Sequence, residues 1–231
     1  MKRSEINQYI GEAIDFMEAR GLALPPFAYW TPADWEKAGP EYQEIVDNML
    51  GWDITDFGSG DFREIGLTIF TFRNGNSHKK DLYPKNYAEK LLLVGDGQVV
   101  PHHFHWSKME DIINRGSNDL LVTLYNSDQD GQFSDEDVAV TIDGRQVVVK
   151  AGGQLTLGPG ESITLKPGQY HLLQGIPGAG PVMMFEVSTT NDDNVDNRFH
   201  TAKFRLPEVV EDVEPTHLIF ADYPKYVNLI K

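Results

Sequence analysis

The first fifty residues carry apolar positions at helical spacing. After Ser4, which can cap a helix, one face holds apolar side chains at positions 6, 9, 10, 13, 14 and 17, and Gly21 stands where a helix commonly ends. The pair Thr31-Pro32 is typical of a helix start and predicts a second helix to Ala38. A further helical stretch is expected over residues 41–50. The pattern therefore predicts a mainly helical N-terminal arm.

From Gly66 onward the pattern changes to short apolar runs separated by turn sequences such as NGN, GDG, DGR and KPGQ. The runs are LTIFTF, KLLLV, LLVTLYN, VAVTI, QVVVK, SITL and VMMFEVS. Many short strands with little helix between them indicate an antiparallel sandwich or barrel rather than a parallel α/β sheet. We therefore expect one domain over residues 1–231, with an arm at 1–60 packed on a β-barrel at 61–231 that includes a C-terminal extension.

Composition limits the partners of the protein. The chain of 231 residues has 35 acidic and 20 basic side chains, a formal net charge of −15. Such a charge disfavours nucleic acid and anionic membranes, which need clustered cations, and a neutral small molecule suits it better. The sequence has no cysteine, which excludes disulfides and thiolate metal sites. The start of the chain has no apolar signal segment, and no long apolar run follows, so we expect a cytoplasmic protein.

Three of the seven histidines lie in the window His102-His103-Phe104-His105. Side chains alternate between the two faces of a strand, so His103 and His105 point the same way and can chelate one ion. Glu110 follows five residues later, and His171 precedes an apolar run that is typical of a neighbouring buried strand. Three imidazoles and one carboxylate suit Mn, Fe, Co, Ni or Zn better than Mg or Ca.

Some of these residues also have purely structural interpretations. Ser107 and Glu110 match a capping box, which would make Glu110 part of a helix start that continues through Ile112 and Ile113. His171 taken alone fits a packed strand residue as well as it fits a ligand. The remaining histidines at 78, 200 and 217 are expected to be ordinary structural or surface residues.

Two segments resemble the motifs of the cupin superfamily. The first runs from Gly97 through His103-Phe104-His105 and Glu110 to Gly116, with every ligand position filled and only the closing glycine one residue early. The second runs from Gly160 through Gly168 to His171. It departs from the motif in carrying Pro167 one residue late and Gly175 where Asn is common. The resemblance implies a cupin barrel and a metal centre but leaves the reaction open.

Further segments are similar to those of the D-lyxose ketol-isomerases, a cupin family. They are the helical arm, the long interval from Glu110 to Gly160, residues 88–91 and residues 186–199, so the likeness covers nearly the whole chain. The resemblance implies a Mn²⁺ site that interconverts D-lyxose and D-xylulose, and also D-mannose and D-fructose. It also makes Asp193 and Arg198, in an otherwise ordinary polar loop, candidate substrate-binding residues.

Aldose–ketose exchange moves a proton between C1 and C2 of the open sugar, through a cis-enediolate if a carboxylate carries the proton. Glu186 is the candidate shuttle because it interrupts an apolar strand, where its side chain faces either solvent or a functional cavity. Glu110 is the second candidate. Lys90, in the run EKLLLV, is expected to donate hydrogen bonds to substrate oxygens or to lie at a sheet edge. Trp30 can stack on the sugar, although packing is its more ordinary role.

Three other functions are compatible with the same motifs. A cupin dioxygenase would use the same ligands with Fe or Ni and consume oxygen. A non-catalytic cupin would bind sugar without converting it. A phosphosugar isomerase would need several converging cations, which the sequence does not show. Because dimers are common among soluble proteins, we expect a homodimer.

Overall fold

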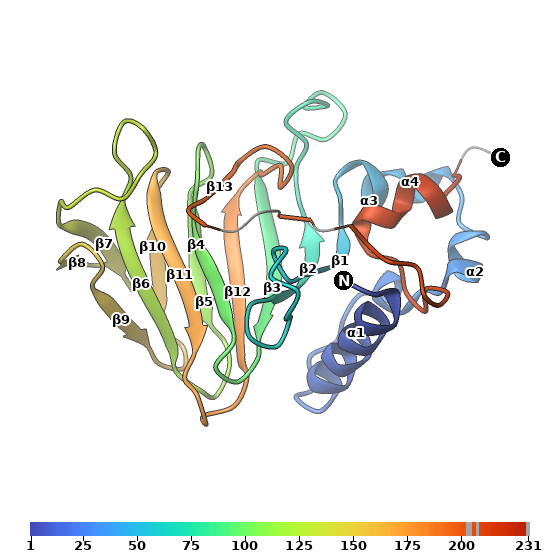
Figure 1. The fold of residues 1–231 in the computed structure, drawn as a ribbon. Helices are drawn as coiled ribbons and strands as arrows, with labels where there is room; N and C mark the ends of the chain where they lie inside the picture. Colours follow the sequence, from blue (N-terminus) through green and yellow to red (C-terminus); the bar gives the residue numbers. More distant parts are fainter. Residues whose placement is uncertain (202–204, 207, 230–231) are drawn as a thin grey trace.

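The computed structural model describes residues 1–201, 205–206 and 208–229. It consists of two facing antiparallel β-sheets, with helices gathered at one side (Figure 1). The helical elements are α1 (Arg3–Glu18), η1 (Pro26–Tyr29), α2 (Pro32–Trp35), η2 (Pro40–Tyr42), α3 (Gln43–Asp47), η3 (Phe220–Asp222) and α4 (Tyr223–Tyr226). Among the described residues, no helix is both long and apolar enough to cross a bilayer.

The two sheets differ in size. The larger sheet has the order β1-β2-β3-β12-β5-β10-β7-β8 and the smaller one the order β13-β4-β11-β6-β9. The strands are β1 (Gly51–Thr55), β2 (Leu67–Arg73), β3 (Tyr87–Val94), β4 (Val99–His105), β5 (Glu110–Asn114), β6 (Leu120–Asn126), β7 (Val138–Ile142), β8 (Arg145–Val149), β9 (Gln154–Leu157), β10 (Ser162–Leu165), β11 (Gln169–Gly175), β12 (Val182–Thr189) and β13 (Asn197–Phe199). The predicted mainly-β architecture is confirmed.

The main core lies between the two sheets, because alternate side chains of each strand point inward. On β6 the side chains of Leu120, Val122 and Leu124 are fully buried, while the intervening residues are partly exposed. Ile112 and Ile163 face them from the larger sheet within the same apolar cluster. This alternation also decides which polar residues of the same strands enter the barrel.

Helix α1 covers the outer face of the larger sheet. Its buried residues Ile6, Ile10, Ala13 and Met17 form one stripe that belongs to the same cluster as Trp52. The helix starts at Arg3, so the expected N-cap at Ser4 is wrong. The Ser4 hydroxyl instead donates to Asp212 in the C-terminal segment. By contrast, Thr31 does cap α2, through its hydroxyl and backbone contacts with Asp34.

Two other local predictions need correction. Strand β1 (Gly51–Thr55) lies inside the arm expected to be mainly helical, because its backbone pairs with β2 from Gly51↔Thr71 to Thr55↔Leu67. Residues 110–114 form strand β5 rather than a helix capped by Ser107. Hydrogen bonding to β10 and β12 on either side outweighs the local capping pattern.

A buried arginine ties the start of the chain to its C-terminal segment. The guanidinium of Arg3 is fully buried and donates two hydrogen bonds to Asp222, at 2.6 and 2.9 Å. It donates two more to the partly exposed Glu211, at 2.9 and 3.0 Å. These four hydrogen bonds satisfy most of the N–H donors of the guanidinium group. The N-terminal and C-terminal segments thereby form one layer against the larger sheet.

We expect Arg3→Met to lower the free energy of unfolding by about 3 kcal/mol, because it leaves the buried Asp222 carboxylate without its cation. Denaturant unfolding measures this change. The control is Arg63→Met, which breaks an equally short but exposed pair with Glu12. The control should cost less than about 1 kcal/mol. Equal losses in the two variants would contradict the role given to burial.

Candidate metal centre

Neighbouring strands of the smaller sheet place three histidines together. His103 of β4 is directly opposite His171 of β11, and alternation brings His105 to the same inner face. Two residues further along β11, Leu173 is opposite Val100, whereas regular antiparallel pairing would place it opposite Pro101. The register therefore shifts by one residue. This β-bulge contains Pro101, which has no backbone N–H and so cannot donate a hydrogen bond to the neighbouring strand. The bulge lets both Val100 and His103 face the interior.

Backbone carbonyls orient two of the imidazole rings. Nδ1 of His103 lies 2.8 Å from the Pro101 carbonyl oxygen, and Nδ1 of His171 lies 3.1 Å from that of Gln169. A carbonyl only accepts, so each Nδ1 carries the proton and each Nε2 presents a lone pair. Metal-binding histidines are commonly held in this way. The backbone therefore prepares both rings to act as ligands.

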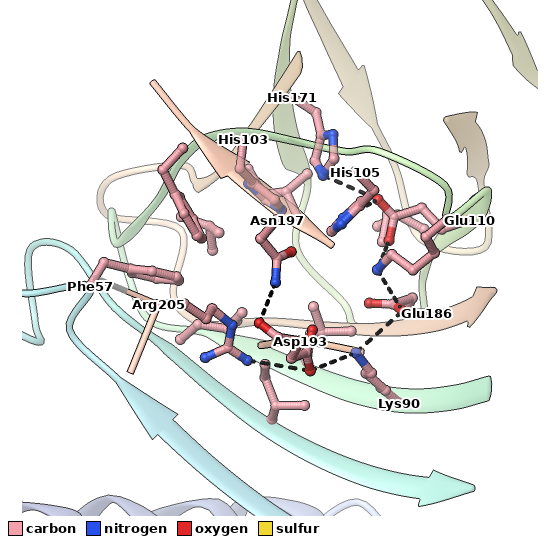
Figure 2. A pocket seen from close by; sticks show the side chains of 18 residues that line it. Phe57, Lys90, His103, His105, Glu110, His171, Glu186, Asp193, Asn197 and Arg205 are labelled. Atoms are coloured by element: carbon pink, nitrogen blue, oxygen red, sulfur yellow. Dashed lines mark hydrogen bonds and ion pairs between the residues drawn. The ribbon is translucent and has the colours of Figure 1, made fainter. Parts of the chain in front are cut away.

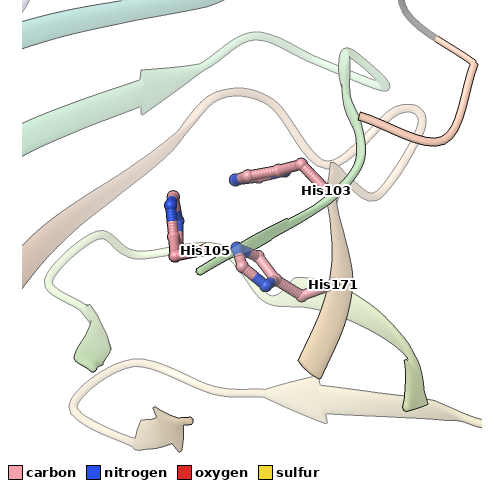
Figure 3. Close-up of side chains that lie close together, drawn as sticks. All are labelled: His103, His105 and His171. Carbon is pink, nitrogen blue, oxygen red and sulfur yellow. The ribbon is translucent and has the colours of Figure 1, made fainter. Parts of the chain in front are cut away.

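The ligand atoms converge on one point. The nitrogens of His103, His105 and His171 all lie within 4.8 Å of one another (Figure 3). Oε1 of Glu110 lies 3.2 Å from Nε2 of both His105 and His171. Two atoms each about 2.1 Å from an ion and at right angles would be about 3.0 Å apart. The spacing of these four side chains fits a shared first-row metal ion.

Unpaired polar atoms support the same assignment. Within the described part of the chain, Oε1 of Glu110 and both ring nitrogens of His105 are buried without a hydrogen-bond partner. Buried polar atoms are normally paired, so an unpaired group needs an explanation. A bound cation would satisfy the Glu110 oxygen and one of the two His105 ring nitrogens, because each side chain offers one ligand atom to the ion. The donor set of imidazoles and carboxylate suits Mn, Fe, Co, Ni or Zn.

Protonation also suits metal binding. Burial, with His171 and His105 nearby, holds the pKa of His103 well below its ordinary value. Burial and the charge of Lys108 lower the pKa of His105. Burial opposes ionisation of Glu110, but Lys108 and His105 outweigh it and hold the pKa of Glu110 well below its usual range. Neutral imidazoles and an ionised carboxylate are the forms that bind a cation.

Beside the histidines, charged side chains of alternating sign line one pocket (Figure 2). Nζ of Lys108 lies 2.6 Å from Glu110 and 2.9 Å from Glu186. Nζ of Lys90 lies 3.7 Å from Glu186 and 3.1 Å from Asp193. The series continues through Arg205, which contacts Asp193 at 3.7 Å and is hydrogen-bonded to Asp53. We call these seven residues the charge chain; all of them except Asp53 line the pocket.

Strand register in the larger sheet places two members of the charge chain, Glu186 and Lys90, side by side. Glu186 in the middle of β12 pairs with Lys90 of β3 on one side and with Ile112 of β5 on the other. These residues point inward, and Lys90 and Glu186 are both almost completely buried. The cavity interpretation of Glu186 therefore holds, and Lys90 does not lie at a sheet edge.

Neighbouring charges shift the pKa values of Lys108 and Asp193 toward their ionised forms. Burial lowers the pKa of Lys108, but Glu110 and Glu186 outweigh it and raise that pKa. Burial likewise opposes ionisation of Asp193, yet Lys90 and Arg205 hold its pKa below its usual value. When all seven side chains are ionised, four carboxylates and three cations give the charge chain one excess negative charge. A divalent cation beside Glu110 would reverse that imbalance.

Two candidate substrate residues lie elsewhere. Arg198 is on β13 between Asn197 and Phe199, which both line the pocket, so alternation turns Arg198 to the opposite face, near Tyr170. Trp30 packs edge-on against Trp35 and Tyr42, with ring centroids 4.9 and 4.8 Å away. Neither residue lines the pocket.

Several pocket residues were not predicted from the sequence. Lys108 stands two positions before Glu110, and strand alternation from Glu110 would have predicted that the two side chains lie on the same face. Asn197 and Arg205 also line the pocket, and Asp53 supports Arg205 from β1. No local pattern marks Arg205 or Asp53. Arg198 was expected to lie in the pocket, but the arginine that lines the pocket is Arg205.

Comparison with known proteins decides the family. The D-lyxose isomerase family profile matches residues 1–223. The chain belongs to the D-lyxose isomerase family. A Serratia proteamaculans protein named D-lyxose/D-mannose isomerase is 44% identical over 98% of this chain and 100% of its own. An Escherichia coli O157:H7 protein of the same name is 46% identical, over 96% and 97%. The protein is thus a sugar isomerase that acts between aldose and ketose.

Solved structures confirm the fold class. L-ribose isomerase of Cellulomonas parahominis, solved with L-ribose, superposes with a TM-score of 0.58 over 91% of this chain and 98% of that one, at 17% identity. An Acinetobacter sp. DL28 L-ribose isomerase gives the same score at 15% identity, over the same shares of the two chains. The cupin fold expected for this family member is confirmed.

We expect the wild-type protein to bind one divalent first-row ion, and His103→Ala to weaken that binding more than about tenfold. The matched control is His102→Ala, which removes the adjacent imidazole from the other face of β4. Calorimetric titration with Mn²⁺, with metal content measured after dialysis, compares the three proteins. Equal losses in both variants would contradict the assignment of inward-facing ligands.

Proposed function

We propose that this D-lyxose isomerase family member interconverts D-lyxose and D-xylulose, and D-mannose and D-fructose, by metal-dependent proton transfer. The observation that carries the proposal is that the candidate ligands and every member of the charge chain except Asp53 line the same buried pocket. Metal ligands and a carboxylate–ammonium series in one cavity suit chemistry in which negative charge moves across adjacent carbons. The names of the two bacterial relatives supply the aldoses D-lyxose and D-mannose, and the family resemblance implies the two ketoses.

His103, His105, Glu110 and His171 would hold the metal, which we propose to be manganese. Once bound, such an ion polarises the substrate oxygens and makes the proton on the neighbouring carbon more acidic. The chain contributes the fixed positions of these side chains. Lys108 holds Glu110 from the other side, at 2.6 Å. This contact limits rotation of the carboxylate, so one oxygen stays directed at the imidazoles.

Glu186 is the residue we propose to carry the proton between C1 and C2. Its Oε1 accepts hydrogen bonds from Lys108 at 2.9 Å and from Ser188 at 3.0 Å. Among the described residues, these contacts all end on Oε1 and leave Oε2 free to take and return the proton. A carboxylate that serves both carbons from one face gives a cis-enediolate of the sugar. Glu110 is the second candidate for this role.

The remaining cations of the charge chain would bind and orient the sugar. Lys90 and Lys108 are the cations that flank Glu186, so they can stabilise negative charge developing on the sugar oxygens. Asp193 accepts a hydrogen bond from Lys90 at 3.1 Å and is placed to accept from a sugar hydroxyl. Closure of the pocket by apolar residues such as Leu92 and Ile112 keeps water away from the reacting carbons.

The pairing of these cations disfavours a phosphosugar substrate. Lys90, Lys108 and Arg205 each contact at least one carboxylate of the pocket. A phosphate would have to break such pairs, whereas a neutral polyol needs only hydrogen bonds. An oxygenase with the same ligands would consume oxygen, which a sugar isomerase does not. The expected cytoplasmic homodimer remains a prediction.

We expect Glu186→Gln to lower kcat by about 10² to 10⁴, because the amide cannot carry the proton, while metal content stays at the wild-type level. Asp111→Asn is the matched control, since Asp111 lies opposite Val187 of β12 and bonds Thr164 rather than a pocket residue. That variant should retain near-normal turnover. Normal turnover in the Glu186 variant would transfer the shuttle role to Glu110 or Asp193.

A further inference from the structure

The pocket that holds the charge chain is small. Its cavity volume is about 30 Å³, which is room for about two water molecules. A second cavity of about 440 Å³ lies outside the smaller sheet. Phe57 is the one described residue that lines both cavities. Its side chain therefore forms part of the wall between them.

The backbone at Phe57 has an unusual conformation. Its φ of +52° is in the left-handed region, which non-glycine residues rarely adopt. The Thr55 hydroxyl accepts a hydrogen bond from the Phe57 amide at 3.0 Å and donates one to the Arg205 carbonyl at 2.7 Å. Left-handed non-glycine residues persist where their surroundings hold them, often at functional sites. The conformation places a large ring, 3% exposed, at the cavity wall.

Aromatic contacts link this ring to a candidate ligand. The Phe57 ring lies 5.4 Å from that of Phe199, which in turn stacks at 5.3 Å and 25° on His103. Figure 2 shows Phe57 on the side of the pocket away from Glu110, beyond Asp193 and Arg205. A sugar with C1 and C2 near Glu186 and the candidate ligands would therefore extend its far end toward Phe57.

We propose that Phe57 is a specificity-determining residue whose ring limits the length of sugar that the site accepts, and that the second cavity receives the far end of longer sugars. The inference rests on the proposed function. D-Lyxose and D-mannose share their configuration at C2 to C4, and mannose is one carbon longer at the far end. The side chain that closes this end is thus the one that distinguishes them.

The second cavity has the chemistry of a site for a neutral hydroxylated group. Its described lining includes Ser59, Pro101, Leu172 and Thr201, and none of the described lining residues is Lys, Arg, Asp or Glu. A charged group such as a phosphate would find no counter-ion on these residues. A hydroxymethyl group or a further CHOH unit needs only a hydroxyl partner and apolar contact.

The test measures kcat/KM for D-lyxose and D-mannose with Mn²⁺-loaded wild-type protein and variants. Phe57→Gly removes the ring and suits the positive φ, so it should raise the mannose-to-lyxose ratio about tenfold or more. Phe57→Trp should lower the ratio. Met49→Gly is the matched control, because Met49 is also left-handed, at φ +55°, but does not line either cavity. It should leave the ratio unchanged.

Phe57→Leu provides a second reduction of the ring if the glycine variant does not fold, and it should shift the ratio in the same direction. An unchanged ratio in a folded Phe57 variant that still converts D-lyxose would overturn the specificity role alone. Wild-type protein inert toward both sugars would overturn the proposed function, and this inference with it.

Discussion

Mutual neutralisation of buried charges is the constraint on which the pocket depends. Glu110, Glu186, Lys90 and Lys108 are each at most 4% exposed, and an isolated charge at such depth would be strongly unfavourable. Each is stable because a neighbour of opposite sign lies within 4 Å. The same pairing fixes where each carboxylate points. The same set of contacts therefore stabilises the buried charges and orients the carboxylates of the pocket.

The barrel makes this arrangement possible because antiparallel strands present every second residue to the interior. Glu110 and Ile112 alternate with partly exposed residues on β5, so one strand supplies both a polar pocket residue and the apolar core. The bulge at Pro101 adjusts this alternation and lets Val100 and His103 share the inner face. Pairing of β4 with β11 then brings in His171. The candidate metal site thus follows from strand register rather than from a flexible loop.

How much could be predicted from sequence depended on how local each signal was. His103, His105 and Glu110 lie within eight consecutive residues, so their pattern could be recognised in the sequence. The structure brings these side chains together with His171. Arg198 was a candidate only through the family resemblance. Its short strand β13 was not predicted, and alternation along that strand turns its side chain away from the pocket. Arg205 and Asp53 are 152 positions apart, so their contact depends on the tertiary fold. No periodicity could have revealed it.

The most direct test of the proton-transfer account is incubation of the Mn²⁺-loaded protein with D-lyxose in heavy water, followed by NMR of the ketose. If Glu186 carries the proton and exchanges it with solvent, the xylulose formed contains deuterium at C1. Xylulose formed at a normal rate with only protium at C1 would contradict transfer through an exchangeable carboxylate and favour a direct hydride shift.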